Sequence, residues 1–367
     1  MAGAAVRLAA VAPLTSVAGG EAMLLRLLPE LRSRRWDVVA TVPRRGELEE
    51  RLRREGVPVV RLPLGPPARR KPVAALAGAV RAVRLAGAAD IVLLNGLSAQ
   101  RVLHAVRLRR RPAVLHVHNP IVGGVSAWAR SWTWSVVRAV IADSSACARE
   151  CVEAGAPAER VHPLHPPAWG GVMEPRAAPL DGPGRVGFIG RLEPRKGIED
   201  LIVAARRFLR GRPKASLTVV GSPSEGAPPG YQASLRAAAR ASGVMDRIVF
   251  AGWRSDSGAA LAEFDVVCVP SHAEPFGTVA AEAAAHGVPV VATDVGGLSE
   301  VVVDRETGVL VPPHNPAALA AAIAPLLDDR ETRARMGARA RERALARFAP
   351  GPYADRVDAL LREAVGR

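Results

Sequence analysis

The most informative stretch of the chain reads Glu274-Pro275-Phe276-Gly277-Thr278-Val279-Ala280-Ala281-Glu282. An apolar run at 265–270 precedes it and predicts a buried strand, and an alanine-rich segment ending at His286-Gly287 predicts a helix after it. Open α/β sheets bind ligands at the carboxyl ends of their strands, so both glutamates fall where a ligand would lie. Gly277 would let backbone N–H groups approach a bound group closely. Because carboxylates accept hydrogen bonds from hydroxyls, the pair suits a polyhydroxylated ligand such as a sugar or a ribose.

Strand and helix patterns alternate on both sides of this stretch, which predicts right-handed βαβ units and parallel sheets. The predicted strands are 6–11, 36–42, 57–62, 90–95, 113–118, 137–142, 185–189, 216–220, 247–250, 266–270 and 288–292. The helical patterns cover 21–34, 47–55, 74–85, 102–109, 144–154, 198–209, 233–241, 316–327, 330–348 and 352–364.

The length of the chain and a linker-like stretch within it predict two domains. Its 367 residues exceed one ordinary domain. The stretch 163–183 interrupts the alternation and is rich in Pro, Gly and Ala, which is typical of a linker. We therefore expect an α/β protein with two doubly wound, Rossmann-like domains, at 1–168 and 182–348, facing a central cleft.

Composition indicates full cores and leaves the meaning of the charge open. Hydrophobic residues make up 49% of the chain, and its Gly and Pro residues are dispersed, which argues against disorder. The formal net charge is +15. Such a charge has two possible origins. A GC-rich genome favours arginine throughout the chain, or the charge serves an anionic partner such as a nucleotide or a membrane surface.

The same composition predicts a cytoplasmic protein. The three cysteines, Cys147, Cys151 and Cys268, cannot all pair, which fits a reducing compartment. No segment offers the roughly 20 apolar residues that span a bilayer, and the first residues lack a secretory pattern. Peripheral contact with the inner membrane face remains an open alternative.

A second candidate segment is the basic loop Gly190-Arg191-Leu192-Glu193-Pro194-Arg195-Lys196-Gly197, which follows a predicted strand and precedes a predicted helix. Two cations, Arg191 and Lys196, beside a helix N-terminus would make a diphosphate site. The alternative is a solvated basic turn. The chain has only three lysines, and keeping one here favours the diphosphate site.

Polar residues also end strands in the first half. His116 and His118 alternate on one predicted strand and so share a face. No third ligand lies at metal-site spacing, which favours a polar role over zinc. Gly20, after the first strand, would let the backbone approach a phosphate or a sugar. Tryptophans 128, 132 and 134 suit core packing, an aromatic wall for an acceptor, or an interfacial surface.

Taken together, these motifs resemble the retaining GT-B glycosyltransferases of glycosyltransferase family 4. The paired glutamates at 274 and 282 and the loop with Arg191 and Lys196 carry the resemblance. So do Val140-Ile-Ala-Asp-Ser144 and Gly287-Val-Pro-Val-Val-Ala-Thr-Asp294 with Gly296-Gly297. Two positions depart from the family's habits: His165-Pro166-Pro167 stands where Asn-Gly is frequent, and Asn119 follows His118 where Asp is frequent.

The resemblance implies roles for individual residues. Arg191 and Lys196 would hold the donor diphosphate and stabilise it as leaving group, and Glu282 would bind the nucleotide ribose. Glu274 would contact the transferred sugar, aided by backbone N–H groups near the loop residues Phe276, Gly277 and Thr278. His118 would face the reaction centre, and Gly20 would admit the diphosphate or the acceptor. The helix at 352–367 would cross back onto the first, acceptor-side domain, leaving 182–348 as the donor-binding domain.

The resemblance therefore implies a retaining transferase that moves a sugar from a UDP- or GDP-sugar to an acceptor hydroxyl, with no metal and no cofactor. The acceptor would be a small molecule, a lipid-linked compound or a glycan. One alternative is a nucleotide-sugar hydrolase or epimerase on the same scaffold. Another is a non-catalytic nucleic-acid binder. The scattered basic residues and few aromatics argue against that binder, so we expect no nucleic-acid partner.

Overall fold

A computed structural model describes residues 5–17, 19–63, 72–119, 127–168, 184–224, 226–254 and 256–366. It forms two compact units, Met1–Pro166 with Pro350–Arg367 (unit 1) and Pro167–Ala349 (unit 2). The domains expected from sequence were 1–168 and 182–348, with the final helix from 352. The linker expected at 163–183 lies largely outside the described residues.

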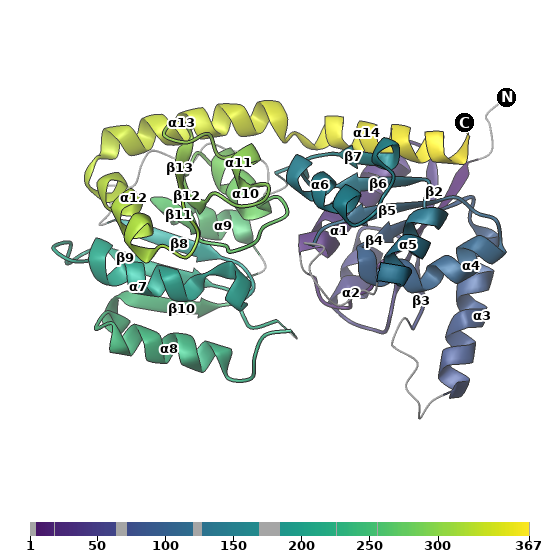
Figure 1. Cartoon of the computed structure of the whole chain (residues 1–367), viewed down its shortest axis with the longest axis horizontal. Helices are drawn as coiled ribbons and strands as arrows, with labels where there is room; N and C mark the ends of the chain where they lie inside the picture. Colours follow the sequence, from purple (N-terminus) through teal and green to yellow (C-terminus); the bar gives the residue numbers. More distant parts are fainter. Residues whose placement is uncertain are drawn as a thin grey trace. The chain divides into compact units, whose positions relative to one another are not determined.

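Unit 1 is built on one parallel sheet of seven strands in the order β3-β2-β1-β4-β5-β6-β7 (Figure 1). Its strands are β1 (Val6–Val11), β2 (Trp36–Val42), β3 (Val59–Arg61), β4 (Ile91–Asn95), β5 (Ala113–Val117), β6 (Ala139–Ala142) and β7 (Val161–Pro163). Its helices are α1 (Gly19–Ser33), α2 (Glu47–Arg54), α3 (Pro72–Ala88), η1 (Leu97–Val102), α4 (Leu103–Leu108), α5 (Ala127–Val136), α6 (Ser145–Glu153), η2 (Ala158–Arg160) and α14 (Pro350–Val365).

Unit 2 is built on a parallel sheet of six strands in the order β10-β9-β8-β11-β12-β13. Its strands are β8 (Arg185–Ile189), β9 (Ser216–Val220), β10 (Ile248–Gly252), β11 (Val266–Val269), β12 (Val290–Thr293) and β13 (Gly308–Val311). Its helices are η3 (Pro194–Lys196), α7 (Ile198–Phe208), α8 (Tyr231–Ala241), η4 (Met245–Arg247), α9 (Ser257–Ala262), α10 (Thr278–Ala285), α11 (Leu298–Val301), α12 (Pro316–Asp328) and α13 (Arg330–Arg347).

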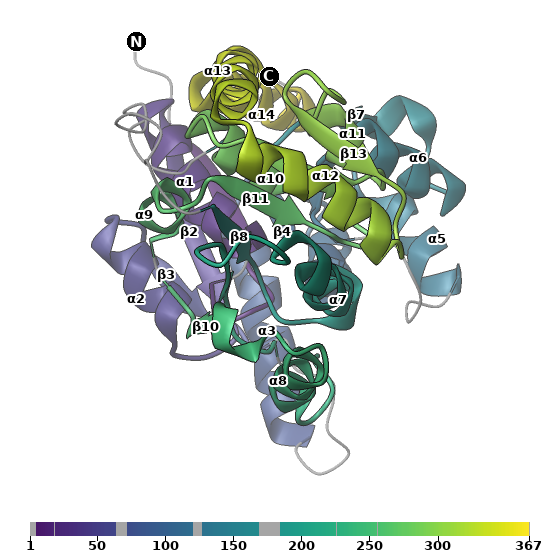
Figure 2. The ribbon, with the colours of Figure 1, turned by 90° about the vertical axis from the view of Figure 1, so that its left-hand side faces the viewer.

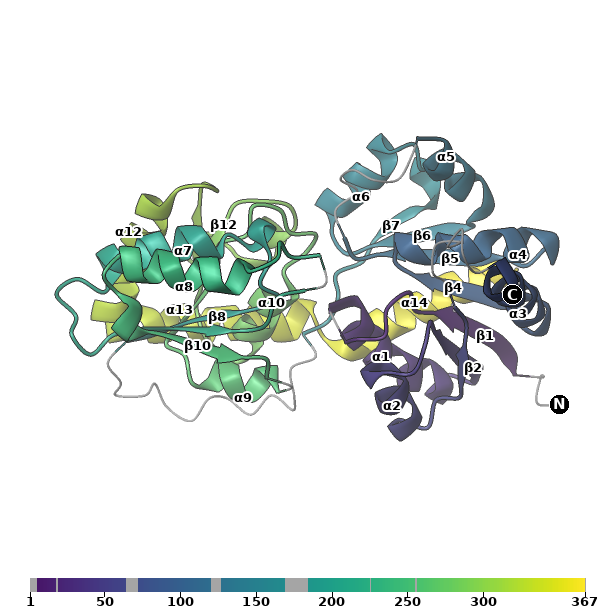
Figure 3. The ribbon, with the colours of Figure 1, turned by 90° about the horizontal axis from the view of Figure 1, so that it is seen from below.

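Helices cover both faces of the sheet in unit 2. One core joins the strands to α7, α8 and α12, and a second joins them to α9, α10 and α13. Figure 2 shows α7 beside α12, and Figure 3 shows α7 and α8 on one side of the sheet with α9 on the other. In unit 1, α14 packs against α1, β4 and β5 (Figure 3). The predicted class, two doubly wound Rossmann-like domains, is confirmed.

The strand orders locate the ligand-binding edge of each unit. Strand order reverses between β1 and β4 in unit 1 and between β8 and β11 in unit 2. Ligands of open α/β sheets bind in the crevice beyond the carboxyl ends of the strands at such a reversal. The loops after these four strands are therefore where each unit would hold a ligand. Within the described residues, no helix combines the length and apolarity needed to cross a bilayer.

Candidate active site

In unit 2, the loops after β8 and β11 bring together two of the predicted residues. Lys196 Nζ lies 2.5 Å from Glu274 Oε2, and the Ser271 hydroxyl donates to the same carboxylate oxygen at 3.0 Å. Both side chains of the ion pair are largely buried, at 17% and 10% exposure. The sequence interpretation placed these groups on one ligand, but not in contact with each other. Their contact makes a nearly neutral, preformed pair at the strand-order reversal.

The surroundings keep Glu274 ionised. Burial alone would raise the pKa of this carboxyl, but the Lys196 ammonium beside it, the Arg195 charge and the Ser271 hydrogen bond hold the pKa below its ordinary value. A carboxylate accepts hydrogen bonds and donates none. Glu274 is therefore suited to receive hydroxyl donors rather than to supply a proton.

The backbone of Glu274 is fixed by the segment after β12. Its carbonyl oxygen accepts a hydrogen bond from the Gly297 N–H at 3.0 Å. Gly296 has φ +54°, and a Cβ atom there would lie 1.9 Å from the same carbonyl oxygen. Only glycine permits this approach, because an L side chain meets both the positive φ and the carbonyl.

We expect Gly296→Ala to lower the free energy of unfolding by more than about 2 kcal/mol, because it combines left-handed strain with a backbone clash. Gly211→Ala is the matched control, since Gly211 has φ +74° with open space around it and should cost only about 1 kcal/mol. Chemical denaturation of both variants measures the difference. Equal losses would contradict the close approach to Glu274.

The two arginines of the basic loop share one carboxylate. Arg191 Nη1 lies 2.9 Å from Glu193 Oε1, and Arg195 Nε lies 2.8 Å from Glu193 Oε2. Burial alone would raise the pKa of Glu193, but Arg191 and then Arg195 lower it. Arg195 also donates to the Ala273 carbonyl at 3.3 Å, so it joins this loop to the loop of Glu274. Arg195 was not among the candidate residues, although its loop was.

The segment after Glu274 begins α10. Gly277 precedes the helix with φ +99°, and Thr278 is its first residue. The first N–H groups of a helix have no acceptor within it, so they are available to an anion or a hydroxyl. The Phe276 ring packs edge-on against Phe348 in the core. Glu282 is buried within α10 and accepts a hydrogen bond from the Ser257 hydroxyl at 3.2 Å.

In unit 1, Gly20 and His118 lie in contact. A Cβ atom on Gly20 would come within 2.8 Å of His118 Cδ2, so α1 reaches the imidazole only because glycine stands there. His118 follows β5 and is bound on both ring nitrogens. Nδ1 lies 3.1 Å from Asp143 Oδ2, and Nε2 lies 2.8 Å from Asn95 Oδ1. These groups gather at the carboxyl ends of β4, β5 and β6.

Asp143 supports both histidines. Its other oxygen lies 2.8 Å from Nε2 of His116, whose ring centroid is 3.8 Å from that of His118. Burial would raise the pKa of Asp143, but His118 and His116 lower it to about 2. Burial and the neighbouring His118, opposed by Asp143, lower the pKa of His116 to about 4. Asp143 therefore accepts a hydrogen bond from Nδ1–H of His118 and orients the imidazole ring.

Sequence spacing missed this carboxylate. No third ligand was expected beside the histidines, but Asp143 stands 25 residues after His118 and meets it through the pairing of β5 with β6. The only signal was its place in the quoted segment Val140-Ile-Ala-Asp-Ser144.

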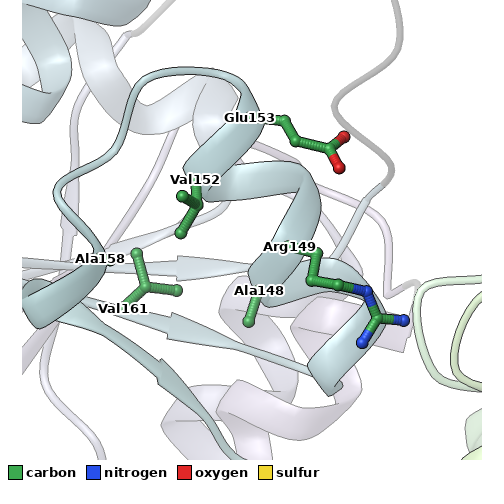
Figure 4. A pocket seen from close by; sticks show the side chains of 6 residues that line it. All are labelled: Ala148, Arg149, Val152, Glu153, Ala158 and Val161. Carbon is green, nitrogen blue, oxygen red and sulfur yellow. The ribbon is translucent and has the colours of Figure 1, made fainter.

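The tryptophans and cysteines that the sequence analysis discussed lie in packed or buried positions where the structure describes them. Trp134 is buried and donates to the Ala154 carbonyl, and Trp132 stacks on His104. The Trp128 side chain lies outside the described residues. All three cysteines are buried free thiols. A shallow pocket beside α6 is lined by none of the predicted site residues (Figure 4); it is lined by Ala148, Arg149, Val152, Glu153, Ala158 and Val161.

Comparison with known proteins gives two family matches. Residues 18–167 match the glycosyl transferase 4-like domain, and residues 175–343 match the glycosyl transferases group 1 domain. A Mycobacterium tuberculosis glycogen synthase is 38% identical over 172 residues, 46% of this chain and 40% of that protein. A Corynebacterium glutamicum D-inositol 3-phosphate glycosyltransferase is 45% identical over 163 residues, 43% of this chain and 38% of that protein. Both matches span about two fifths of the relative's length.

Solved structures extend the similarity over nearly the whole chain. HepE from Anabaena, in complex with UDP and glucose, has a TM-score of 0.85 at 24% identity, covering 97% of this chain and 99% of its own. Sucrose-phosphate synthase from Thermosynechococcus elongatus has a TM-score of 0.80 at 23% identity, covering 98% and 99%. These likenesses establish the fold, and the two matched domains establish the family. The chain belongs to the GT-B glycosyltransferases of the family 4 type.

Proposed function

We propose that this chain is a retaining glycosyltransferase that moves a sugar from a UDP- or GDP-sugar to an acceptor hydroxyl without a metal ion. The observation that carries the proposal is the contact between Lys196 and Glu274 where the strand order of unit 2 reverses. A cation for a diphosphate and a carboxylate for sugar hydroxyls lie there side by side.

The ion pair suggests how a donor would be received. Without ligand, Lys196 and Glu274 neutralise each other. The diphosphate of a donor would carry two negative charges and could bind both Lys196 and Arg191. Hydrogen bonds between charged groups of this kind are stronger than those between neutral groups. The Glu274 carboxylate would then accept hydrogen bonds from the hydroxyls of the sugar. The N–H groups at the start of α10 would donate hydrogen bonds to the same donor. Glu282, buried four residues further along α10, would accept from the ribose hydroxyls.

The same cations would assist the chemistry. As the bond between sugar and phosphate breaks, negative charge grows on the diphosphate, and Lys196 and Arg191 would stabilise it there. These side chains would do the work that a metal does in other transferases. The motif resemblance to retaining enzymes supports retention by front-face attack, with the departing phosphate taking the acceptor's proton. His118, positioned by Asp143 and backed by Gly20, is assigned to the reacting sugar and the acceptor side.

We expect donor nucleotides to stabilise the chain against heat. A thermal-shift panel of UDP-, GDP-, ADP- and dTDP-sugars should give a rise in Tm with a UDP- or GDP-sugar. A ligand at 100 times its Kd contributes about 2.7 kcal/mol. UDP-glucose is tested first, because HepE was solved with it. No shift with any of the four classes would count against the proposal.

The donor found in this way also decides between transfer and its alternatives. Incubation with donor and candidate lipid, glycan or small-molecule acceptors in EDTA should form a product whose anomeric configuration, read by NMR, matches that of the donor. Free sugar released at the same rate without acceptor would favour a hydrolase. Interconversion of the donor sugar would favour an epimerase. Activity that vanishes in EDTA and returns with a divalent ion would contradict the metal-free reaction.

A further inference from the structure

A second cluster of ligand-type side chains lies in unit 2 beside the basic loop. Asp200 stands in the first turn of α7, His272 in the loop after β11, and His314 in the loop between β13 and α12. One ligand atom from each residue lies within 4.8 Å of the other two. Three separate elements therefore converge on one point with two imidazoles and one carboxylate.

The individual contacts show how closely these groups are gathered. His272 Nε2 lies 2.8 Å from Asp200 Oδ2, and the His272 and His314 rings are 3.7 Å apart between centroids. The His272 N–H donates to the Arg195 carbonyl at 2.7 Å, which anchors the loop. A Cβ at Gly197 would lie 3.1 Å from His272 Nε2, so glycine leaves room at the ring edge.

We propose that Asp200, His272 and His314 bind a late first-row divalent metal ion, for which Zn²⁺ is the probe. Two imidazole nitrogens and one carboxylate oxygen are ligands that zinc prefers, with a water completing a four-coordinate site. Zinc bonds of about 2.0–2.2 Å place neighbouring ligand atoms roughly 3.3–3.6 Å apart. The three ligand atoms already lie within 4.8 Å of one another, so modest side-chain rotations would bring them to this spacing.

Access and charge are compatible with a bound cation. His314 is exposed, and His272 and Asp200 remain 24% and 20% exposed. The cations nearest in sequence have carboxylate partners, since Lys196 pairs with Glu274, and Arg195 shares Glu193 with Arg191. The His116, His118 and Asp143 group also has ligand-type atoms in range, but it is the more buried of the two and already belongs to the candidate active site.

The three ligand residues are not among the groups assigned to the donor, and the test of the zinc site does not depend on sugar transfer. Metal-stripped chain without a polyhistidine tag is titrated with ZnCl₂ by calorimetry at neutral pH, and bound zinc is counted by atomic absorption after gel filtration. We expect His314→Gln and His272→Gln each to lose one zinc per chain or to weaken its binding at least about tenfold.

The matched control is His104→Gln, which removes an exposed histidine from unit 1 and should bind zinc as the wild type does. Melting of all variants in EDTA checks that each one is folded. The proposal is overturned if the wild type binds no zinc, or if folded His314→Gln keeps the wild-type affinity and stoichiometry. The second result would assign the zinc to other residues, such as the cluster around Asp143.

Discussion

Lys196→Ala is expected to lower kcat/KM for sugar transfer at least about 100-fold, the cost of removing one preorganised group that stabilises charge developing in a transition state. Lys196 is the cation closest to the carboxylate assigned to the sugar, 2.5 Å from Glu274. Its loss removes a partner of the diphosphate and leaves Glu274 buried without its countercharge. Steady-state kinetics with the donor found in the thermal-shift panel measures the effect. Lys214→Ala removes an exposed lysine of the same unit and should leave kcat/KM unchanged.

The same substitution should destabilise the fold in a pH-dependent way. Breaking a largely buried ion pair from one side costs about 3 kcal/mol. In the wild type the pKa of Glu274 is lowered, so its stabilising effect is present above the ordinary Glu pKa of about 4.3 and is lost as pH falls through the folded-state value. In Lys196→Ala the strongest influence that lowers this pKa is lost, so the pKa of Glu274 rises relative to the wild type and protonation relieves the burial penalty at a higher pH. The gap in Tm between the two proteins should narrow as pH falls from 7 toward 4.

A double variant separates stability from activity. Lys196→Met with Glu274→Gln removes both charges, so it should recover most of the stability that Lys196→Ala loses. It should not recover transfer, because neither the diphosphate nor the sugar contact is restored. Wild-type kcat/KM in the double variant would refute the site assignment. Unchanged stability in Lys196→Ala would show that the pair does not form in solution.

The fold was predictable where strands are buried apolar runs. Strands β1, β2, β8 and β9 have the predicted bounds, because both faces of a parallel sheet are covered and each strand is mostly apolar. β7 and β13 were missed. Both are short edge strands of three and four residues with half-exposed positions, and the apolar run of β13 is too short to predict a strand by itself. Helices α5, α9 and α11 were also missed, and the last two have only six and four residues.

The site was predictable residue by residue but not as a set of contacts. Lys196 and Glu274 are 78 residues apart, and they meet because β8 pairs with β11, which is not its neighbour in sequence. The same holds for Asp143 and Asn95, which reach His118 from the strands on either side of β5. Local motifs report which chemistry a loop can carry. The order of strands in the sheet decides which loops share a site. The residue spacing within one motif carries no information about that order.

Asp143→Asn is expected to lower kcat/KM about 100-fold while leaving the thermal shift by the donor nucleotide unchanged, because the groups assigned to that nucleotide lie in unit 2. Asp143 accepts from both His116 and His118 through separate oxygens. The amide keeps one acceptor oxygen and adds a donor, so it cannot hold both rings as the carboxylate does. Asp143 is a positioning residue: it acts through His118 and is not assigned a ligand contact.

Acid unfolding supplies the readout that tests this role directly. The pKa of Asp143 falls from 3.8 to about 2 in the folded chain, a shift worth on the order of 2 kcal/mol of stability. Because the folded-state value is the lower one, this stability is present above pH 3.8 and disappears as pH falls toward 2. Asp143→Asn should therefore flatten the pH dependence of unfolding between those values, whereas Asp37→Asn, at an exposed aspartate of β2, should not. If the variant shows a flattened acid profile but wild-type kcat/KM, Asp143 stabilises the fold only. Its orientation of His118 would then have no part in the reaction.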